Sequence, residues 1–193
     1  MLSKRKLEER ELRKQKILDG ALKVFKIHGI EKTTMDEVAH ESGFGKATLY
    51  YYYTSKDEVF VDIMVKGWKD LWEGIESRIV EEKSPKEKFS GIIKKIGLIV
   101  GNNKNLYGFL FTAPNHIQDT SKQVWKTYQE RLYAILKSII DEGIKKKEFV
   151  DIDPGLLMKA IGGLFHGLVI SNEEHVDEHD LEIMVNNLLN PKK

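Results

Sequence analysis

A run of four tyrosines, Tyr50 to Tyr53, closes a short segment that begins with Lys46 and is followed by Lys56. On a short helix, four neighbouring side chains point in different directions, so at least two of the tyrosines must be exposed. Tyrosine hydroxyls donate to phosphate oxygens, and aromatic rings pack against sugars and thymine methyl groups. The segment therefore suggests a surface for a charged or aromatic partner, with a lysine at either end.

The residues before the tyrosines predict a helix-turn-helix. Thr34 and Glu37 have the spacing of a capping box, which marks the start of a helix. Gly43 and Gly45 then favour a tight turn, and a second short helix is expected over 46–53. Two helices joined by such a turn form a helix-turn-helix.

The predicted second helix has two faces. Leu49 and Tyr53 are i, i+4 neighbours and should point into a core. Ala47, Thr48 and Tyr51 share the opposite face, which is therefore expected to be the one that meets the partner. An interface with another protein is the alternative use of these tyrosines.

Composition excludes several classes of protein. The 193 residues are 41% hydrophobic and 32% charged, which is typical of one or two globular domains. Cysteine is absent, so a disulfide scaffold, a thiolate zinc site and a cysteine nucleophile are excluded. No apolar run reaches the roughly 18 residues that a membrane span needs, and no export signal is visible. We expect a cytoplasmic protein that does not enter a membrane.

Charge is distributed unevenly. Residues 1–16 hold seven Lys or Arg against three Glu, whereas residues 173–182 hold six acidic residues and no Lys or Arg. A polyanion would therefore meet the N-terminal part of the chain.

Hydrophobic periodicity is helical almost throughout, and no paired strands are expected. An all-α fold of about nine helices is predicted, with the helices near 5–28, 35–42, 46–53, 56–82, 86–101, 104–113, 118–146, 154–171 and 179–189. The natural division falls near residue 55, which separates three short N-terminal helices (1–55) from a longer antiparallel helical bundle (56–193).

Motifs for catalysis, phosphate loops and metal binding are weak. Gly43–Lys46 resembles part of a phosphate loop, but His40 and Ala47 replace the glycine and the hydroxyl residue that it requires. His175 and His179 have a metal-compatible spacing within an acidic stretch, and we predict no metal there. No Ser-His-Asp grouping is evident. We therefore expect no cofactor and no enzymatic activity.

The N-terminal part resembles the TetR (tetracycline-repressor-like) family of bacterial transcriptional regulators. The resemblance covers residues 10–60 and rests on His28-Gly29, Thr33-Thr34, the run from Ser42 to Tyr53, and Ser55 to Glu58. Two positions depart from the family pattern. Gly45 replaces a Ser or Thr helix cap, and Tyr53 replaces a phenylalanine, so a buried Tyr53 hydroxyl would need a partner.

The resemblance implies a ligand-responsive regulator that binds operator DNA. It places Lys46, Ala47, Thr48 and Tyr51 near base edges in the major groove, and Thr34, Tyr50, Tyr52 and Lys56 on phosphates. The basic segment before Arg13 would add further contacts. A repressor that a small, largely apolar effector releases from a near-palindromic operator is the expected function.

The resemblance also implies that the C-terminal bundle encloses the effector. The expected lining residues are Trp68, Phe89, Phe109, Trp125, Tyr128 and His166. Dimerisation is expected through the last two helices. An apolar stripe over 157–168 supports this expectation, because three glycines beside it would let two backbones approach closely. Burial of these helices within one chain is the alternative.

Two other classes of protein remain open from the sequence. One is a helical adaptor that presents the tyrosine face to a protein, and the other is a helical enzyme that binds a small molecule.

Overall fold

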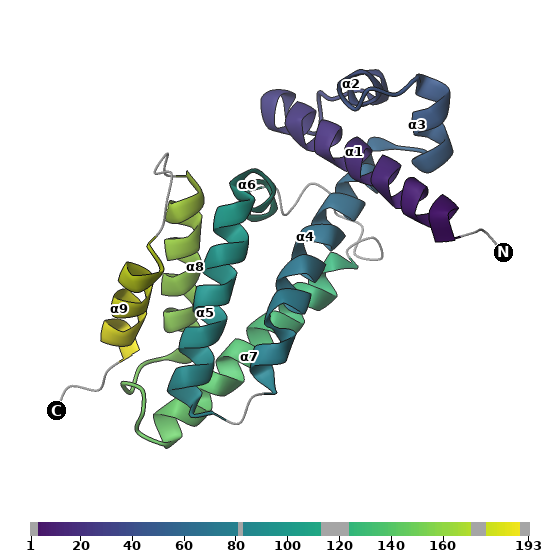
Figure 1. The fold of residues 1–193 in the computed structure, drawn as a ribbon. Coiled ribbons are helices and arrows are strands. Elements are labelled where there is room, and N and C mark those ends of the chain that lie inside the picture. The colour runs from purple at the N-terminus through teal and green to yellow at the C-terminus, as the bar shows by residue number, and fades with distance from the viewer. Residues whose placement is uncertain (1–3, 81–82, 113–123, 171–176, 190–193) are drawn as a thin grey trace. The chain divides into compact units, whose positions relative to one another are not determined.

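The computed structural model describes residues 4–80, 83–112, 124–170 and 177–189. These residues form helices without any strand, which confirms the predicted all-α class (Figure 1). The nine helices of this described part are α1 Lys4–His28, α2 Met35–Glu41, α3 Lys46–Tyr52, α4 Lys56–Ile79, α5 Pro85–Asn102, α6 Lys104–Thr112, α7 Trp125–Lys145, α8 Pro154–Ile170 and α9 Glu178–Leu189.

The observed helix bounds follow local sequence signals. α2 and α5 each begin with a capping box, formed by Thr34 with Glu37 and by Ser84 with Glu87. Asp153 accepts from the backbone N–H of Leu156 at 2.8 Å and so caps α8. Predicted and observed bounds agree within a few residues. The start predicted for α7 is an exception, because residues 118–123 lie outside the described part.

The chain divides into two compact units, and each is described separately. The N-terminal unit holds the described residues up to Lys66 together with Thr112 and Val124, and the C-terminal unit holds the other described residues from Gly67 onward. The division falls inside the continuous helix α4, whereas the sequence suggested a boundary at residue 55, just before this helix.

The N-terminal unit is built on α1, which packs against α2, while α2 packs against α3. Its core contains Ile17, Phe25, Val38 and Leu49, each at most 3% exposed. A Cβ added at Gly20 would lie 2.8 Å from the backbone nitrogen of Ser42, so only glycine lets α1 and α2 approach this closely.

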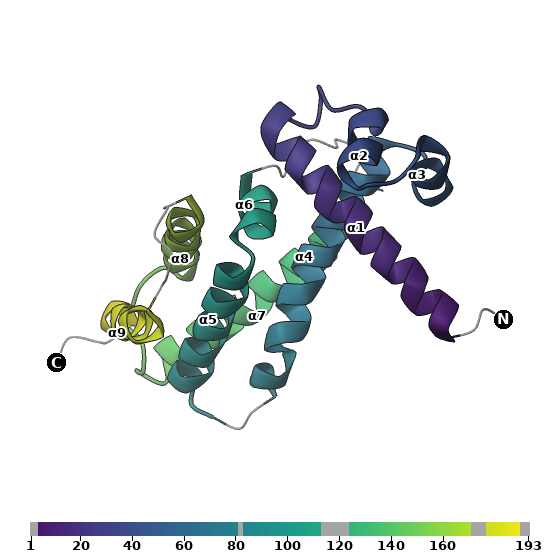
Figure 2. The same ribbon diagram turned by 45° about the horizontal axis from the view of Figure 1, so that its top comes forward.

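The C-terminal unit is organised around α5, which contacts α7, α8 and α9 (Figure 2). Phe89, Ile92 and Ile93 on α5 are fully buried. The ring of Phe89 packs edge-on against Phe149, with 5.7 Å between ring centroids. No helix in the described part of the chain combines the length and apolarity of a membrane span.

The burial of residues on α8 differs in one detail from the expected dimer surface. Leu157, Ile161 and Phe165 are at most 5% exposed, so much of the predicted apolar stripe faces the core of its own chain. The outer face instead carries Gly162 and Gly163, where an added Cβ would meet nothing within 4 Å. Periodicity identified the apolar face but did not reveal which surface covers it.

Candidate functional site

Helix α3 presents its tyrosines as the sequence predicted. Leu49 is fully buried and Tyr53, directly after the helix, is 3% exposed, whereas Tyr50 is 51% exposed and Tyr51 is 73% exposed. The rings of Tyr51 and Tyr52 pack edge-on with 5.2 Å between centroids. The apolar side of α3 thus holds the helix on its unit and leaves an aromatic ridge exposed.

The rest of the predicted contact surface lies beside this ridge. Lys46 and Ala47 are exposed, and Thr48 is half-buried. Gly45 caps α3 without any side-chain hydrogen bond, as its lack of a side chain requires. A short helix that follows α2 after a Gly43 turn at φ +73° completes a helix-turn-helix.

Two residues predicted to contact phosphates or bases interact with neighbouring side chains of the N-terminal unit. The ammonium group of Lys46 forms an exposed ion pair with Asp36 of α2. The backbone N–H of Thr34 donates to Glu37 Oε2 at 2.7 Å, and its hydroxyl donates to the same oxygen at 2.9 Å. The backbone hydrogen bond is the main reason that the pKa of Glu37 lies below its ordinary value.

Lys56, also predicted to hold a phosphate, binds the backbone instead. Its Nζ donates to the carbonyl oxygen of Glu31 at 2.7 Å and to that of Thr33 at 3.2 Å. The lysine therefore fastens the first turn of α4 to the loop between α1 and α2. An ammonium group has three donors, so one remains for a further acceptor.

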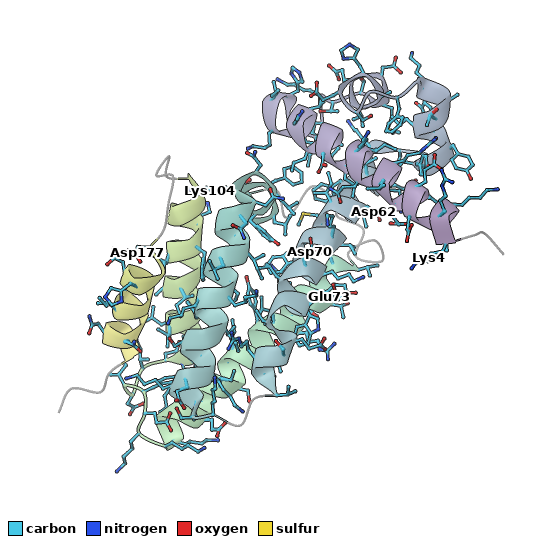
Figure 3. The ribbon with its side chains drawn as sticks, viewed as in Figure 1. Lys4, Asp62, Asp70, Glu73, Lys104 and Asp177 are labelled. Atoms are coloured by element: carbon cyan, nitrogen blue, oxygen red, sulfur yellow. The ribbon has the colours of Figure 1, made fainter. Side chains whose placement is uncertain are left out.

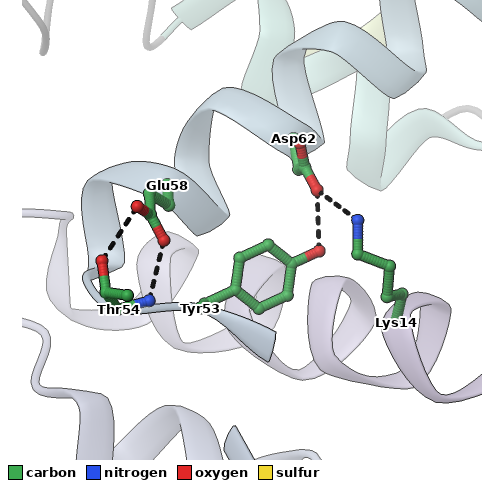
Figure 4. A network of polar contacts seen from close by, with 5 residues as sticks. All are labelled: Lys14, Tyr53, Thr54, Glu58 and Asp62. Atoms are coloured by element: carbon green, nitrogen blue, oxygen red, sulfur yellow. Dashed lines mark hydrogen bonds and ion pairs between the residues drawn. The ribbon is translucent and has the colours of Figure 1, made fainter. Parts of the chain in front are cut away.

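The hydroxyl of Tyr53 has the partner that its burial requires. It donates to Asp62 Oδ2 at 2.9 Å, and Lys14 donates to the same oxygen at 3.1 Å (Figure 4). Burial and the charge of Asp62 hold the pKa of Tyr53 well above its ordinary value. Glu58 accepts from the backbone N–H of Thr54 at 2.7 Å in the same view.

These partners were missed by sequence reasoning. Asp62 lies on α4 and Asp36 on α2, and no motif marks either residue (Figure 3 labels Asp62). The substitution of tyrosine for phenylalanine at position 53 was the one available signal, because it required a polar partner.

Four of the six predicted effector residues are buried in the C-terminal unit, namely Trp68, Phe89, Phe109 and Trp125. Tyr128 is half-buried and His166 is exposed on α8, so His166 does not join the buried set within a single chain. The ring of Trp68 packs edge-on against Phe111 at 6.3 Å and Tyr133 at 6.2 Å. Trp68 thus lies within an aromatic cluster that spans α4, α6 and α7.

Asp70 on α4, labelled in Figure 3, affects a neighbouring buried tyrosine. Burial raises the pKa of Tyr107, and the charge of Asp70 raises it further.

No group of three metal-binding side chains occurs in the described part of the chain. His175, one of the two histidines considered as metal ligands, lies outside the described residues.

An exposed aromatic helix on a helix-turn-helix, followed by an all-helical unit, is typical of DNA-binding regulators. Comparison with known families agrees. Residues 17–63 match the family described as "Bacterial regulatory proteins, tetR family", and residues 82–170 match "Tetracyclin repressor-like, C-terminal domain". The chain belongs to the TetR family. Membership of this family makes it a DNA-binding transcriptional regulator.

Similar proteins include the fatty acid metabolism regulator protein of Bacillus subtilis, which is 21% identical over 95% of both chains. The structure of FadR from B. subtilis in complex with stearoyl-CoA has a TM-score of 0.70 at 22% identity, covering 90% of this chain and 96% of that one. The structure of AibR with isovaleryl coenzyme A and operator DNA has a TM-score of 0.80 at 18% identity, covering 93% and 100%.

Proposed function

We propose that α3 reads operator DNA in the major groove. Lys46, Ala47, Thr48 and Tyr51 contact base edges in this proposal, and Thr34, Tyr50, Tyr52 and Lys56 contact phosphates. The observation that carries the proposal is the exposed Tyr51, at 73%, on a helix whose Leu49 is fully buried. A large aromatic residue held out on a rigid helix is available to base edges and sugars.

A dimer would present two such helices about 34–36 Å apart, one turn of DNA, and would therefore read a near-palindrome. We propose that α8 and α9 form the dimer contact, with the open glycine face of α8 allowing close approach. The basic start of α1, where Arg5, Lys6 and Arg10 are exposed, would add phosphate contacts. A regulator that acts on bacterial DNA would work in the cytoplasm.

We propose an acyl-coenzyme A as the effector. Two proteins of the same fold bind acyl-CoA compounds, and a relative is named for fatty acid metabolism. The four buried aromatic residues predicted for the effector suit an apolar acyl chain.

Release from DNA would pass through α4, whose first turns belong to the N-terminal unit and whose remainder belongs to the C-terminal unit. An effector that binds better when α4 is displaced would shift the population toward the released state. A coupling free energy of about 1–3 kcal/mol is enough for such regulation.

The proposal is tested by selecting bound fragments from a random DNA pool and then titrating the selected duplex with acyl-CoA compounds of increasing chain length. We expect a near-palindromic duplex whose complex dissociates with at least one acyl-CoA. A protein that selects no sequence at low salt would refute DNA reading by α3. A selected duplex that every acyl-CoA leaves bound would refute the effector class alone.

A further inference from the structure

Two buried indole N–H groups in the C-terminal unit lack a hydrogen-bond acceptor. They are Nε1 of Trp68 on α4 and Nε1 of Trp125 at the start of α7, on side chains that are 2% and 1% exposed. Among the described residues, no other buried side-chain nitrogen or oxygen lacks a partner. Buried indole N–H groups are normally paired, so each of the two needs an acceptor that this part of the chain does not supply.

The surroundings of Trp68 make such an acceptor valuable. Phe111 and Tyr133 pack edge-on against the ring of Trp68, with 6.3 and 6.2 Å between ring centroids. In an apolar setting a hydrogen bond is stronger than in water, and an unpaired donor is correspondingly costly. A ligand oxygen that reaches this donor would therefore bind with both affinity and selectivity.

The position of Trp125 suggests an extended ligand. Tyr133, which contacts Trp68, lies on the same helix as Trp125 and follows it by about two turns, or about 12 Å of helix rise. The two donors thus belong to neighbouring parts of one helical unit, and separate acceptors along one chain would serve them better than a single atom.

We propose that Trp68 and Trp125 donate hydrogen bonds to the effector, which therefore carries oxygen acceptors at separate points along its length. This inference rests on the proposed acyl-CoA effector and adds the residues that recognise its polar atoms. An acyl-CoA has a thioester carbonyl and, further along, the amide carbonyls of its pantetheine arm. A site built to pair with such groups discriminates strongly against analogues that lack them, because its own buried donors are then left unpaired.

The indole signals of the protein itself provide the test. The chain has three tryptophans, so a ¹⁵N-tryptophan sample gives three indole N–H resonances, assignable with single Trp→Phe variants. Isovaleryl-, octanoyl- and stearoyl-CoA are the probes. We expect the tightest-binding probe to move the Trp68 and Trp125 resonances downfield, and to move Trp72, which is also buried, much less.

An analogue of the ligand can lack one hydrogen-bond acceptor while the protein stays unchanged. The thioether analogue of the tightest probe has a methylene group in place of the thioester carbonyl. Loss of one hydrogen bond should weaken binding by about fivefold to tenfold. Trp68→Phe and Trp125→Phe should each weaken acyl-CoA binding similarly, and the variant that lacks the indole paired with the thioester carbonyl should also lose the preference for thioester over thioether. Trp72→Phe, the same change at a buried tryptophan, controls for lost ring volume and should keep that preference.

The outcomes separate the two proposals. Binding of an acyl-CoA that leaves both indole resonances in place, or equal affinity for thioester and thioether, would overturn the role of the indoles while the effector class stands. Failure of all three probes to bind or to release the selected duplex would overturn the acyl-CoA effector, and the inference with it.

Discussion

The hydroxyl of Tyr53 donates to the carboxylate of Asp62 across 2.9 Å, joining the end of α3 to α4 within the N-terminal unit. Lys14 of α1 donates to the same carboxylate oxygen at 3.1 Å, and its ammonium group lies 5.4 Å from the centroid of the Tyr53 ring. Three segments of the chain therefore meet at one carboxylate, which fixes the first turns of α4 within the N-terminal unit.

Replacement of Tyr53 by phenylalanine should lower the free energy of unfolding by about 1–2 kcal/mol near pH 8, because a hydrogen bond to a charged group is lost. The pKa of Tyr53 is higher in the folded state than in the unfolded state. Its contribution to the free energy of unfolding is therefore complete below the ordinary tyrosine pKa of about 10, and is lost as the pH rises above that value. The difference between wild type and Tyr53→Phe should therefore shrink between about pH 10 and pH 11.

Urea unfolding at several pH values provides this measurement. Tyr50→Phe, which removes the hydroxyl of an exposed tyrosine on α3, is the control and should leave stability unchanged at pH 8. A difference between wild type and Tyr53→Phe that is independent of pH would contradict the predicted role of the neutral hydroxyl.

Tyr51→Ala should weaken binding to the selected operator by about 1–3 kcal/mol, since an exposed aromatic residue on the base-facing side is removed. Because the side chain is 73% exposed, thermal stability should hardly change. Fluorescence anisotropy with operator and with scrambled duplex measures the effect. An unchanged ratio between the two affinities would show that Tyr51 does not face the bases.

Asp36→Asn should strengthen DNA binding by a few-fold at low salt, because it removes an anion that pairs with Lys46 and leaves the ammonium group available to DNA. Lys46→Ala should weaken binding. If Lys46 contacts a phosphate, the slope of log affinity against log salt concentration should also fall by about one unit. Weakening without a change of slope would instead indicate a base contact. Asp36→Asn that binds DNA more weakly than wild type would argue against competition for Lys46.

Lys56→Ala distinguishes a structural role from a DNA contact. Loss of the two carbonyl contacts should destabilise the N-terminal unit by about 1–3 kcal/mol, as expected for hydrogen bonds from a charged group. If the remaining donor reaches a phosphate, the salt slope should also fall by about one unit. Lower stability with an unchanged slope would remove Lys56 from the proposed phosphate contacts.

Two glycine substitutions in the N-terminal unit should act in opposite directions. Gly20→Ala places a Cβ 2.8–2.9 Å from atoms of Ser42, including its backbone, and should destabilise the unit by about 1–3 kcal/mol. Gly45→Ser meets open space and supplies a hydroxyl cap to α3, so it should stabilise the protein by a few tenths of a kcal/mol. Differential scanning calorimetry measures both, and a stable Gly20→Ala variant would contradict the tight α1–α2 contact.

Local features of the chain were predictable from the sequence. The Thr34–Glu37 capping box, the glycine turn at residue 43 and the two faces of α3 each depend on residues only a few positions apart. Helical periodicity and capping are short-range effects, so the spacing of residue types determines them. The same spacing carried the resemblance to the TetR family, and with it the expected class of function.

Contacts between distant residues were decided only by the tertiary structure. Lys14 meets Asp62 across 48 positions, and Lys56 reaches the carbonyl of Glu31 across 25. Periodicity likewise marked the apolar side of α8, but packing against neighbouring helices decided that Leu157 faces its own chain. The type of a residue determines which environment its side chain requires, such as burial, an opposite charge or a hydrogen-bond acceptor. Which partner meets that need depends on how the helices pack.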